Sequence, residues 1–167
     1  IRAHGHERAG VSPTESFLAR LTNQKELVDQ VVPLVATHLR PFQLFGAQSG
    51  DAAVRKLANA VGRIDRLVRV SHADHLGRYP LDHEIARAPF EAGQWLLERA
   101  KALNVSDNAP EPIVLGRHLI ELGLKPGPHF KPILDACFEA QLEGKITNLE
   151  EGQQYARTLI ESKPPTN

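Results

Sequence analysis

An apolar face with helical periodicity runs through residues 64–74 and constrains the fold of this chain more than any other feature. On a helix with about 3.6 residues per turn, Ile64, Leu67, Val70 and Ser71 share this face with Asp74. A carboxylate therefore lies on a face that is otherwise suited to burial. Because a buried, unpaired carboxylate is costly, we expect Asp74 to have a cation, a metal ion or hydrogen-bond donors as partners.

A second apolar helix face, within residues 27–38, also carries a polar residue, in this case a histidine. Leu27, Val31, Leu34 and Val35 are expected to line up with His38 on one side of a helix. Two polar residues on two apolar faces suggest one shared site in which His38 and Asp74 meet. The residues alone leave two interpretations of that site open: ligands of one metal ion, or a hydrogen-bonded pair buried between packed helices.

Turn and capping signals divide the chain into helices. Residues 12–15 (SPTE) have the pattern of a capping box with proline in the first turn, which predicts a helix to about Leu21. Asn23 begins a second such pattern, Pro33 is expected to kink the His38 helix, and Arg40-Pro41 to end it. Further helices are expected over 51–61, 64–76, 90–103, 114–122, 129–143 and 149–161, with a loop over 42–50 and a connecting segment over 80–89.

These signals predict an all-α fold, because no segment alternates apolar and polar residues as a half-buried strand does. The expected architecture is an irregular multi-helix bundle with a C-terminal helical extension. A helical domain over residues 1–103 holds the candidate site, and residues 104–112 form a linker rich in turn residues. Residues 113–161 form a C-terminal helical subdomain, and residues 162–167 a disordered tail.

Composition narrows the setting and the partners. Lys and Arg number 20 and Asp and Glu number 20, so bulk charge gives no argument for nucleic-acid binding. The one cysteine, Cys137, excludes an intrachain disulfide and is expected in the core. No apolar run approaches the roughly 20 residues that span a bilayer, so a soluble, cytoplasmic protein is expected. The chain begins at Ile1 and has no methionine, which suggests part of a longer protein.

Local basic residues offer a second candidate surface. Arg66 and Arg69 are expected to face away from the apolar stripe of residues 64–74, and Arg63 precedes them. Guanidinium groups in such an arrangement can position an RNA backbone. Lys125, in the GLKPGP stretch, is a weaker candidate for a phosphate contact. A solvated helix face without a ligand is the alternative interpretation of all four residues.

Five segments carry a family resemblance: HGHERAG (4–10), VATHLRP (35–41), AVRKLA (53–58), SHADHLGR (71–78) and GRHLIELGLKPGPHFKPILDACFEAQLEGKI (116–146). Together they resemble the HD-superfamily metal-dependent phosphohydrolase region of bacterial tRNA nucleotidyltransferases, a family of CCA-adding and poly(A) polymerase-like proteins. The last segment is the most distinctive. The resemblance implies a helical, metal-dependent hydrolase that acts on phosphoesters of nucleotides or RNA, tRNA included.

The resemblance also implies a set of metal ligands. His6 and His38 match the later histidines of that superfamily by position, and Asp74 matches its final aspartate. The superfamily's early histidine and adjacent His-Asp pair have no counterpart here. This suggests that they lie upstream, together with a nucleotidyltransferase domain, and that this chain alone holds an incomplete, inactive site. A divalent cation would lower the pKa of a water molecule and offset charge on the phosphoryl oxygens. Mixed His and Asp ligands leave the identity of the metal open.

Two other functions remain compatible with the residues. One is a non-catalytic helical module that binds tRNA, another RNA or a partner domain, and the other is a purely structural bundle. Considered alone, His6 also fits a surface histidine, and His72 is expected to be exposed. His4 and His75 stay open as residues that support a ligand, whereas His118 and His129 are expected on the surface of the later helices.

Overall fold

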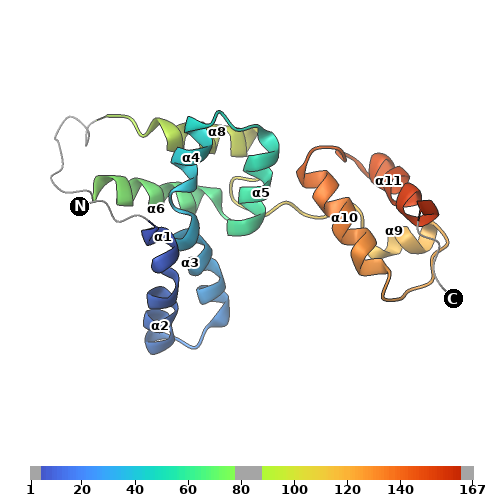
Figure 1. Cartoon of the computed structure of the whole chain (residues 1–167), viewed down its shortest axis with the longest axis horizontal. Coiled ribbons are helices and arrows are strands. Elements are labelled where there is room, and N and C mark those ends of the chain that lie inside the picture. The colour runs from blue at the N-terminus through green and yellow to red at the C-terminus, as the bar shows by residue number, and fades with distance from the viewer. Residues whose placement is uncertain (1–4, 78–87, 163–167) are drawn as a thin grey trace. The chain divides into compact units, whose positions relative to one another are not determined.

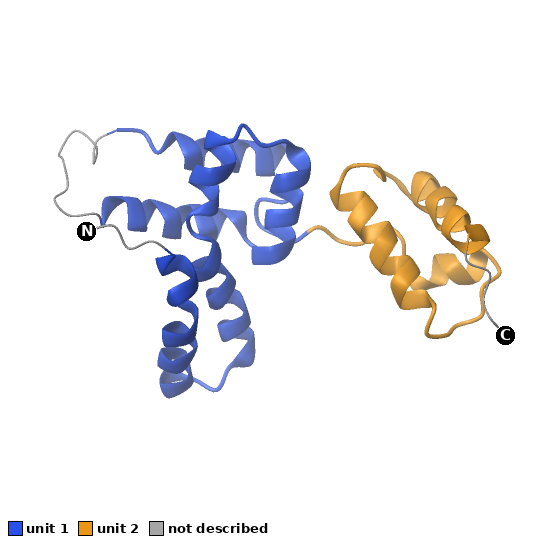
Figure 2. Cartoon of the chain, viewed as in Figure 1, with its two compact units in different colours: residues 1–109 blue, residues 110–167 orange. Residues whose placement is uncertain are grey.

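The computed structural model describes residues 5–77 and 88–162, and every regular element within these ranges is an α-helix (Figure 1). The predicted all-α, multi-helix class is therefore confirmed. The chain divides into two compact units, residues 1–109 and 110–167 (Figure 2). Among the described helices, none combines the length and the apolar character that crossing a bilayer requires.

Unit 1 begins with three helices, α1 (His6–Ala9), α2 (Val11–Leu21) and α3 (Lys25–Thr37), and α2 and α3 pack side by side (Figure 1). The predicted capping box over residues 12–15 is wrong. The backbone is already helical at Gly10, the residue that caps α2, so the chain passes from α1 into α2 without an extended capping residue. The hydroxyl of Thr14 instead donates to the carbonyl oxygen of Gly10 at 2.7 Å.

The predicted end of the His38 helix and the predicted loop over 42–50 are also corrected. Helix α3 ends at Thr37, and α4 (Arg40–Gly46) begins two residues after His38, with Pro41 in its first turn. Proline fits a first turn because the N–H it lacks would have no helical partner there. Pro41 and Leu44 are buried, so packing stabilises a helix where the sequence had suggested a loop.

Three longer helices complete the bundle: α5 (Asp51–Val61), α6 (Ile64–Leu76) and α8 (Glu91–Ala102). The predicted bounds of α5 and α6 are confirmed, and Gly62, with φ 71°, makes the turn between them. Ile64 and Leu67 are fully buried, as the apolar stripe predicts, whereas Leu27 is 40% exposed. Helix α8 packs against α4, α5 and α6. The buried core of unit 1 consists of Leu34, Leu44, Val54, Leu57, Ala58, Val61, Ile64, Leu67, Leu96, Ala100 and Val105.

The segment after α8 still belongs to unit 1. Val105 is buried in its core, and the backbone N–H of Asp65 donates to the carbonyl oxygen of Ser106 at 3.0 Å. The division between the units falls between Ala109 and Pro110, inside the 104–112 stretch that is rich in turn residues.

Unit 2 contains α9 (Gly116–Glu121), α10 (Phe130–Leu142) and α11 (Leu149–Ser162), and both α9 and α10 contact α11. Its core consists of Val114, Leu119, Cys137, Ala140, Ile146 and Ala156. Cys137 is buried as predicted, and burial raises the pKa of its thiol. Ser162 ends α11 rather than beginning a tail, and residues 163–167 lie outside the described part, as do His4, Arg78 and residues 80–87 of the predicted connecting segment.

The prediction that His118 lies on the surface is wrong. His118 is 5% exposed, and its Nδ1 accepts a hydrogen bond from the backbone N–H of Leu115 at 3.0 Å. In return, the backbone N–H of His118 donates to the carbonyl oxygen of Leu115. His118 thus closes the first turn of α9 in the manner of a capping box, with an imidazole in place of the usual carboxylate or amide. His129 is half-buried and folds over Gly127.

Gly93→Ala should destabilise unit 1 by about 1–3 kcal/mol, the usual cost of overpacking a filled core. A Cβ at Gly93 would overlap the ring of Phe90 and approach Cγ1 of Val68 to 3.0 Å. Gly46→Ala is the matched control, because a Cβ there meets nothing within 4 Å. Urea unfolding of the wild type, Gly93→Ala and Gly46→Ala measures the difference in the free energy of unfolding. Equal unfolding midpoints for the two variants would contradict the packing around Phe90.

His118→Ala should lower the free energy of unfolding of unit 2 by about 1–3 kcal/mol, because it leaves the N–H of Leu115 without its side-chain acceptor and removes a buried ring. His118→Asn should recover much of that loss, since its amide oxygen can accept the same hydrogen bond. Tyr155 packs against the core of unit 2, so its fluorescence and denaturant unfolding can follow this unit. Equal stability of the two variants would show that the cap contributes nothing.

Candidate metal centre

His6 is placed by a short turn that precedes the α2–α3 hairpin. Gly5, with φ 75°, starts α1 in a left-handed conformation, and the backbone N–H of Gly10 donates to the carbonyl oxygen of His6 at 2.8 Å. A Cβ at Gly10 would lie 3.1 Å from Cγ1 of Val35. The glycine therefore permits α1 to approach α3 closely, which brings the imidazole of His6 to the C-terminal end of α3.

His38 lies at that end of α3, where its ring is fixed by the backbone. Its Nδ1 is 2.7 Å from the carbonyl oxygen of Val35. A carbonyl can only accept, so Nδ1 carries the hydrogen, and in a neutral ring Nε2 presents its lone pair. A histidine that gives one N–H to a backbone carbonyl and offers the other nitrogen is the arrangement typical of metal ligands.

Asp74 lies in the last turn of α6, and Ser71 connects that helix to His38. The hydroxyl of Ser71, which is fully buried, donates a hydrogen bond to the carbonyl oxygen of His38. Ser71 and Asp74 are three residues apart and share one face of α6. The hydrogen bond therefore fixes the end of α3 against the helix face that carries the carboxylate.

The structure brings the three predicted ligands together. Nε2 of His6 is 2.8 Å from Nε2 of His38, and the ring centroids are 4.8 Å apart. Oδ1 of Asp74 lies 3.6 Å from Nε2 of His6 and 3.7 Å from Nε2 of His38. The distance between His38 and Asp74 is too long for a hydrogen bond, so the two do not form the simple buried pair that the sequence left open.

These distances fit a divalent cation after small movements. With metal–nitrogen and metal–oxygen bonds of about 2.0–2.2 Å, neighbouring ligand atoms are separated by about 3.0–3.4 Å. The three candidate atoms are separated by 2.8, 3.6 and 3.7 Å. Shifts of a few tenths of an ångström would therefore bring all three separations into that range. Two imidazoles and one carboxylate form a donor set that suits several first-row metals.

The site is buried on one side and open on the other. The side chain of His38 is 8% exposed, whereas those of Asp74 and His6 are 30% and 39% exposed. An ion held here would be anchored from the core by His38 and would face solvent on the side of His6 and Asp74.

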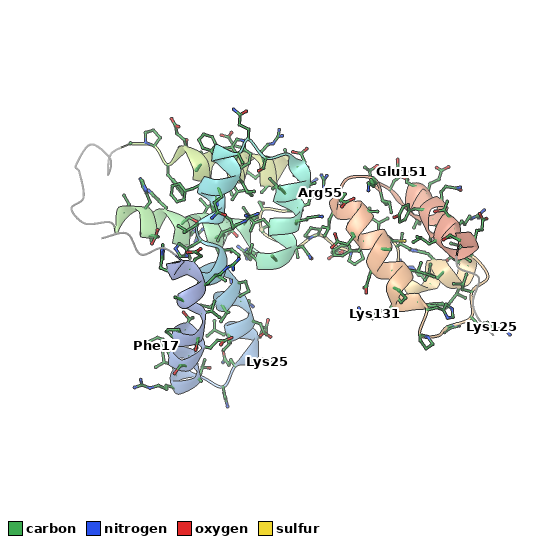
Figure 3. The ribbon with its side chains drawn as sticks, in the orientation of Figure 1. Phe17, Lys25, Arg55, Lys125, Lys131 and Glu151 are labelled. Atoms are coloured by element: carbon green, nitrogen blue, oxygen red, sulfur yellow. The ribbon has the colours of Figure 1, made fainter. Side chains whose placement is uncertain are left out.

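The predicted basic surface is only partly available. Arg63 forms a two-pronged ion pair with Asp65, at 2.8 and 2.7 Å, which holds the pKa of the Asp65 carboxyl below its usual range. Arg66 donates to the side-chain oxygen of Gln30 at 2.7 Å, and both Arg66 and Arg69 are exposed. Lys125 is exposed on the loop between α9 and α10 (Figure 3). Their contact with RNA stays a prediction.

The other histidines of α6 lie outside the candidate centre. His72 is exposed, as expected, and its ring stacks on Phe90 with centroids 5.1 Å apart. His75 is half-buried, and its ring also stacks on Phe90, with centroids 5.9 Å apart. The ring of Phe42 contacts the rings of His75 and Phe90. The stack joins α4, α6 and the start of α8, and it thereby supports the helix that carries Asp74.

Sequence reasoning missed the residues that hold the ligands in place. Ser71 had one usable signal, because it is a polar residue on the same apolar stripe as Asp74. The carbonyl oxygen of Val35, which orients His38, leaves no trace in the sequence. Gly10 could be recognised as a turn residue, but the close approach to Val35 depends on the packing of α1 against α3.

Comparison with known proteins gives one partial match. The A-adding tRNA nucleotidyltransferase of Halalkalibacterium halodurans is 40% identical to this chain over 55 residues, which make up 33% of the chain and 13% of that relative. The matched stretch is therefore a small part of the relative, and the similarity relates the chain to a tRNA nucleotidyltransferase over that stretch alone. No protein-family model and no solved structure matches the chain.

Asp65→Asn should make the stability of unit 1 less dependent on pH. The pKa of Asp65 is lower in the folded chain than its ordinary value of 3.8, so its ion pair stabilises the fold above that value and is lost as the pH falls through the folded pKa. Unfolding by urea between about pH 6 and pH 3 measures this slope. Asp29→Asn, at an exposed position on α3, is the control and should keep the wild-type slope. An unchanged slope in Asp65→Asn would contradict the ion pair.

Proposed function

We propose that unit 1 is a divalent-metal-dependent phosphohydrolase domain of the HD type, in a protein related to tRNA nucleotidyltransferases. Its substrates would be phosphoesters of nucleotides or of RNA, with tRNA among them. The observation that supports this most is the meeting of His6 from α1, His38 at the C-terminal end of α3 and Asp74 from α6, which are separated by 32 and 36 residues in the sequence.

The ligands would divide the work according to their surroundings. His38, fixed through Nδ1 by the carbonyl of Val35, would hold the ion from the buried side. Asp74 would contribute negative charge from the solvent side, and His6 would complete the set. A divalent ion supplies positive charge that activates water and offsets the charge of a phosphoryl group. The more exposed side of the cluster is where a phosphoester would approach.

The resemblance to HD-type hydrolases supports a phosphoester substrate, and the partial similarity to an A-adding tRNA nucleotidyltransferase supports a substrate of the nucleotide or RNA class. The exposed guanidinium groups of Arg66 and Arg69, on the same helix as Asp74, would suit an RNA backbone. A non-catalytic module that binds RNA without hydrolysis would use the same arginines, so the metal-dependent reaction distinguishes the two functions.

The 167-residue chain should bind one equivalent of Zn²⁺ or Mn²⁺ through His6, His38 and Asp74, and any hydrolysis of p-nitrophenyl phosphate or its bis-ester by this chain should depend on the metal. His38→Ala and Asp74→Asn should each weaken metal binding by more than the roughly 10–100-fold loss typical of residues that only support a ligand. His129→Ala, in unit 2, is the matched histidine control and should bind metal as the wild type does. Calorimetry gives the affinity, and a chelator should abolish hydrolysis.

Three outcomes separate the alternatives. Wild-type affinity in His38→Ala and Asp74→Asn would overturn the assignment of the ligands. RNA binding that depends neither on metal nor on Asp74 would favour the non-catalytic RNA-binding module. Absence of metal binding would overturn the proposed metal centre altogether.

A further inference from the structure

Glu7, the residue after His6, has a carboxylate oxygen with no hydrogen bond in the described part of the chain. Its Oε2 is buried, although the side chain as a whole is 20% exposed. A buried carboxylate oxygen without a donor is unfavourable and rare, so it calls for an explanation. The ring of His6 lies beside it, with Nδ1 at 3.9 Å from Oε2.

The hydrogen bonds of His38 explain why Nδ1 of His6 and Oε2 of Glu7 do not form a hydrogen bond. Because Nδ1 of His38 donates to Val35, its Nε2 accepts, and the partner at 2.8 Å is Nε2 of His6. A neutral His6 in this arrangement therefore carries its hydrogen on Nε2 and none on Nδ1. Nδ1 of His6 and Oε2 of Glu7 are then two acceptors facing each other, which cannot form a hydrogen bond.

A metal ion would reverse this arrangement. To ligate through Nε2, His6 must give up the hydrogen on that nitrogen, and the neutral ring then carries it on Nδ1. Nδ1 would become a donor that faces the unpaired oxygen of Glu7. A movement of about 1 Å would shorten the 3.9 Å separation to a hydrogen bond.

We infer that Glu7 is the positioning residue for His6 in the metal-bound state, as the carboxylate that accepts from Nδ1 while Nε2 holds the ion. This inference rests on the proposed metal centre and adds to it a residue that does not touch the metal. Such a carboxylate fixes the ring orientation of a ligating histidine and raises its basicity. It complements the carbonyl of Val35, so each of the two histidines has its own acceptor.

The test compares Glu7→Gln and Glu7→Ala with Glu15→Gln, an exposed glutamate of α2 that serves as the matched control. Zn²⁺ alone is the probe, and calorimetry of the full chain gives its affinity. Glu7→Ala should weaken Zn²⁺ binding about 10–100-fold. Glu7→Gln keeps an acceptor but loses the charge, so its loss should be smaller, and Glu15→Gln should bind as the wild type does.

The tautomer of His6 gives a second, spectroscopic readout. Two-dimensional ¹H–¹⁵N spectra of the histidine rings should show the hydrogen of His6 on Nε2 without metal and on Nδ1 with Zn²⁺. His38 should carry its hydrogen on Nδ1 in both states. A role of Glu7 in folding alone would not produce this exchange.

The outcomes separate this inference from the proposed function. If Glu7→Gln and Glu7→Ala bind Zn²⁺ as tightly as the wild type while His38→Ala does not, the role of Glu7 is overturned and the metal centre stands. If the wild type binds no Zn²⁺, both are overturned. Should Glu7→Ala fail to fold, the isosteric Glu7→Gln and the tautomer of His6 in the wild type decide the question.

Discussion

The hydrogen bond from the hydroxyl of Ser71 to the carbonyl oxygen of His38 is the contact on which the geometry of the candidate centre depends. It joins the end of α3 to the face of α6 one turn before Asp74. Without it, the carbonyl oxygen of His38 would lose its buried hydrogen-bond donor. The short passage from α3 to α4 places this carbonyl beside α6, because α4 in turn packs on α8 and α8 packs on α6.

The core around this contact is apolar, so the polar groups must satisfy one another. His38 uses the carbonyl of Val35, and its other nitrogen faces His6 and Asp74, where the exposed side of the cluster begins. The candidate centre therefore has one buried member, His38, and two members nearer to solvent, His6 and Asp74. That gradient suits an ion that must be held and must also be reached by a substrate.

Much of the fold follows from hydrophobic periodicity in the sequence, whereas the helix ends and the connections between helices do not. The stripes of α5 and α6 predicted both helices with their bounds, because Val54, Leu57, Ile64 and Leu67 repeat at helical spacing. The start of α2 and the whole of α4 were missed, since Gly10 and Pro41 are breakers in isolation and become helical only in their packed context. The meeting of His38 and Asp74 could be anticipated from two polar exceptions on apolar faces. The hydrogen bonds that fix them involve backbone atoms, which carry no sequence signal.

A comparison of the two buried histidines shows why burial alone does not identify a ligand. Each ring uses Nδ1 against the backbone three residues earlier, but His38 donates to a carbonyl and His118 accepts from an N–H. In a neutral ring, the hydrogen of His118 must then sit on Nε2, so its approach to Nε of Arg117 at 3.1 Å brings two donors together rather than forming a second hydrogen bond. Nε2 of His38 keeps a lone pair and faces two other candidate ligands. The backbone partner of Nδ1 therefore decides whether the outer nitrogen offers a lone pair, and it distinguishes the helix cap His118 from the candidate ligand His38.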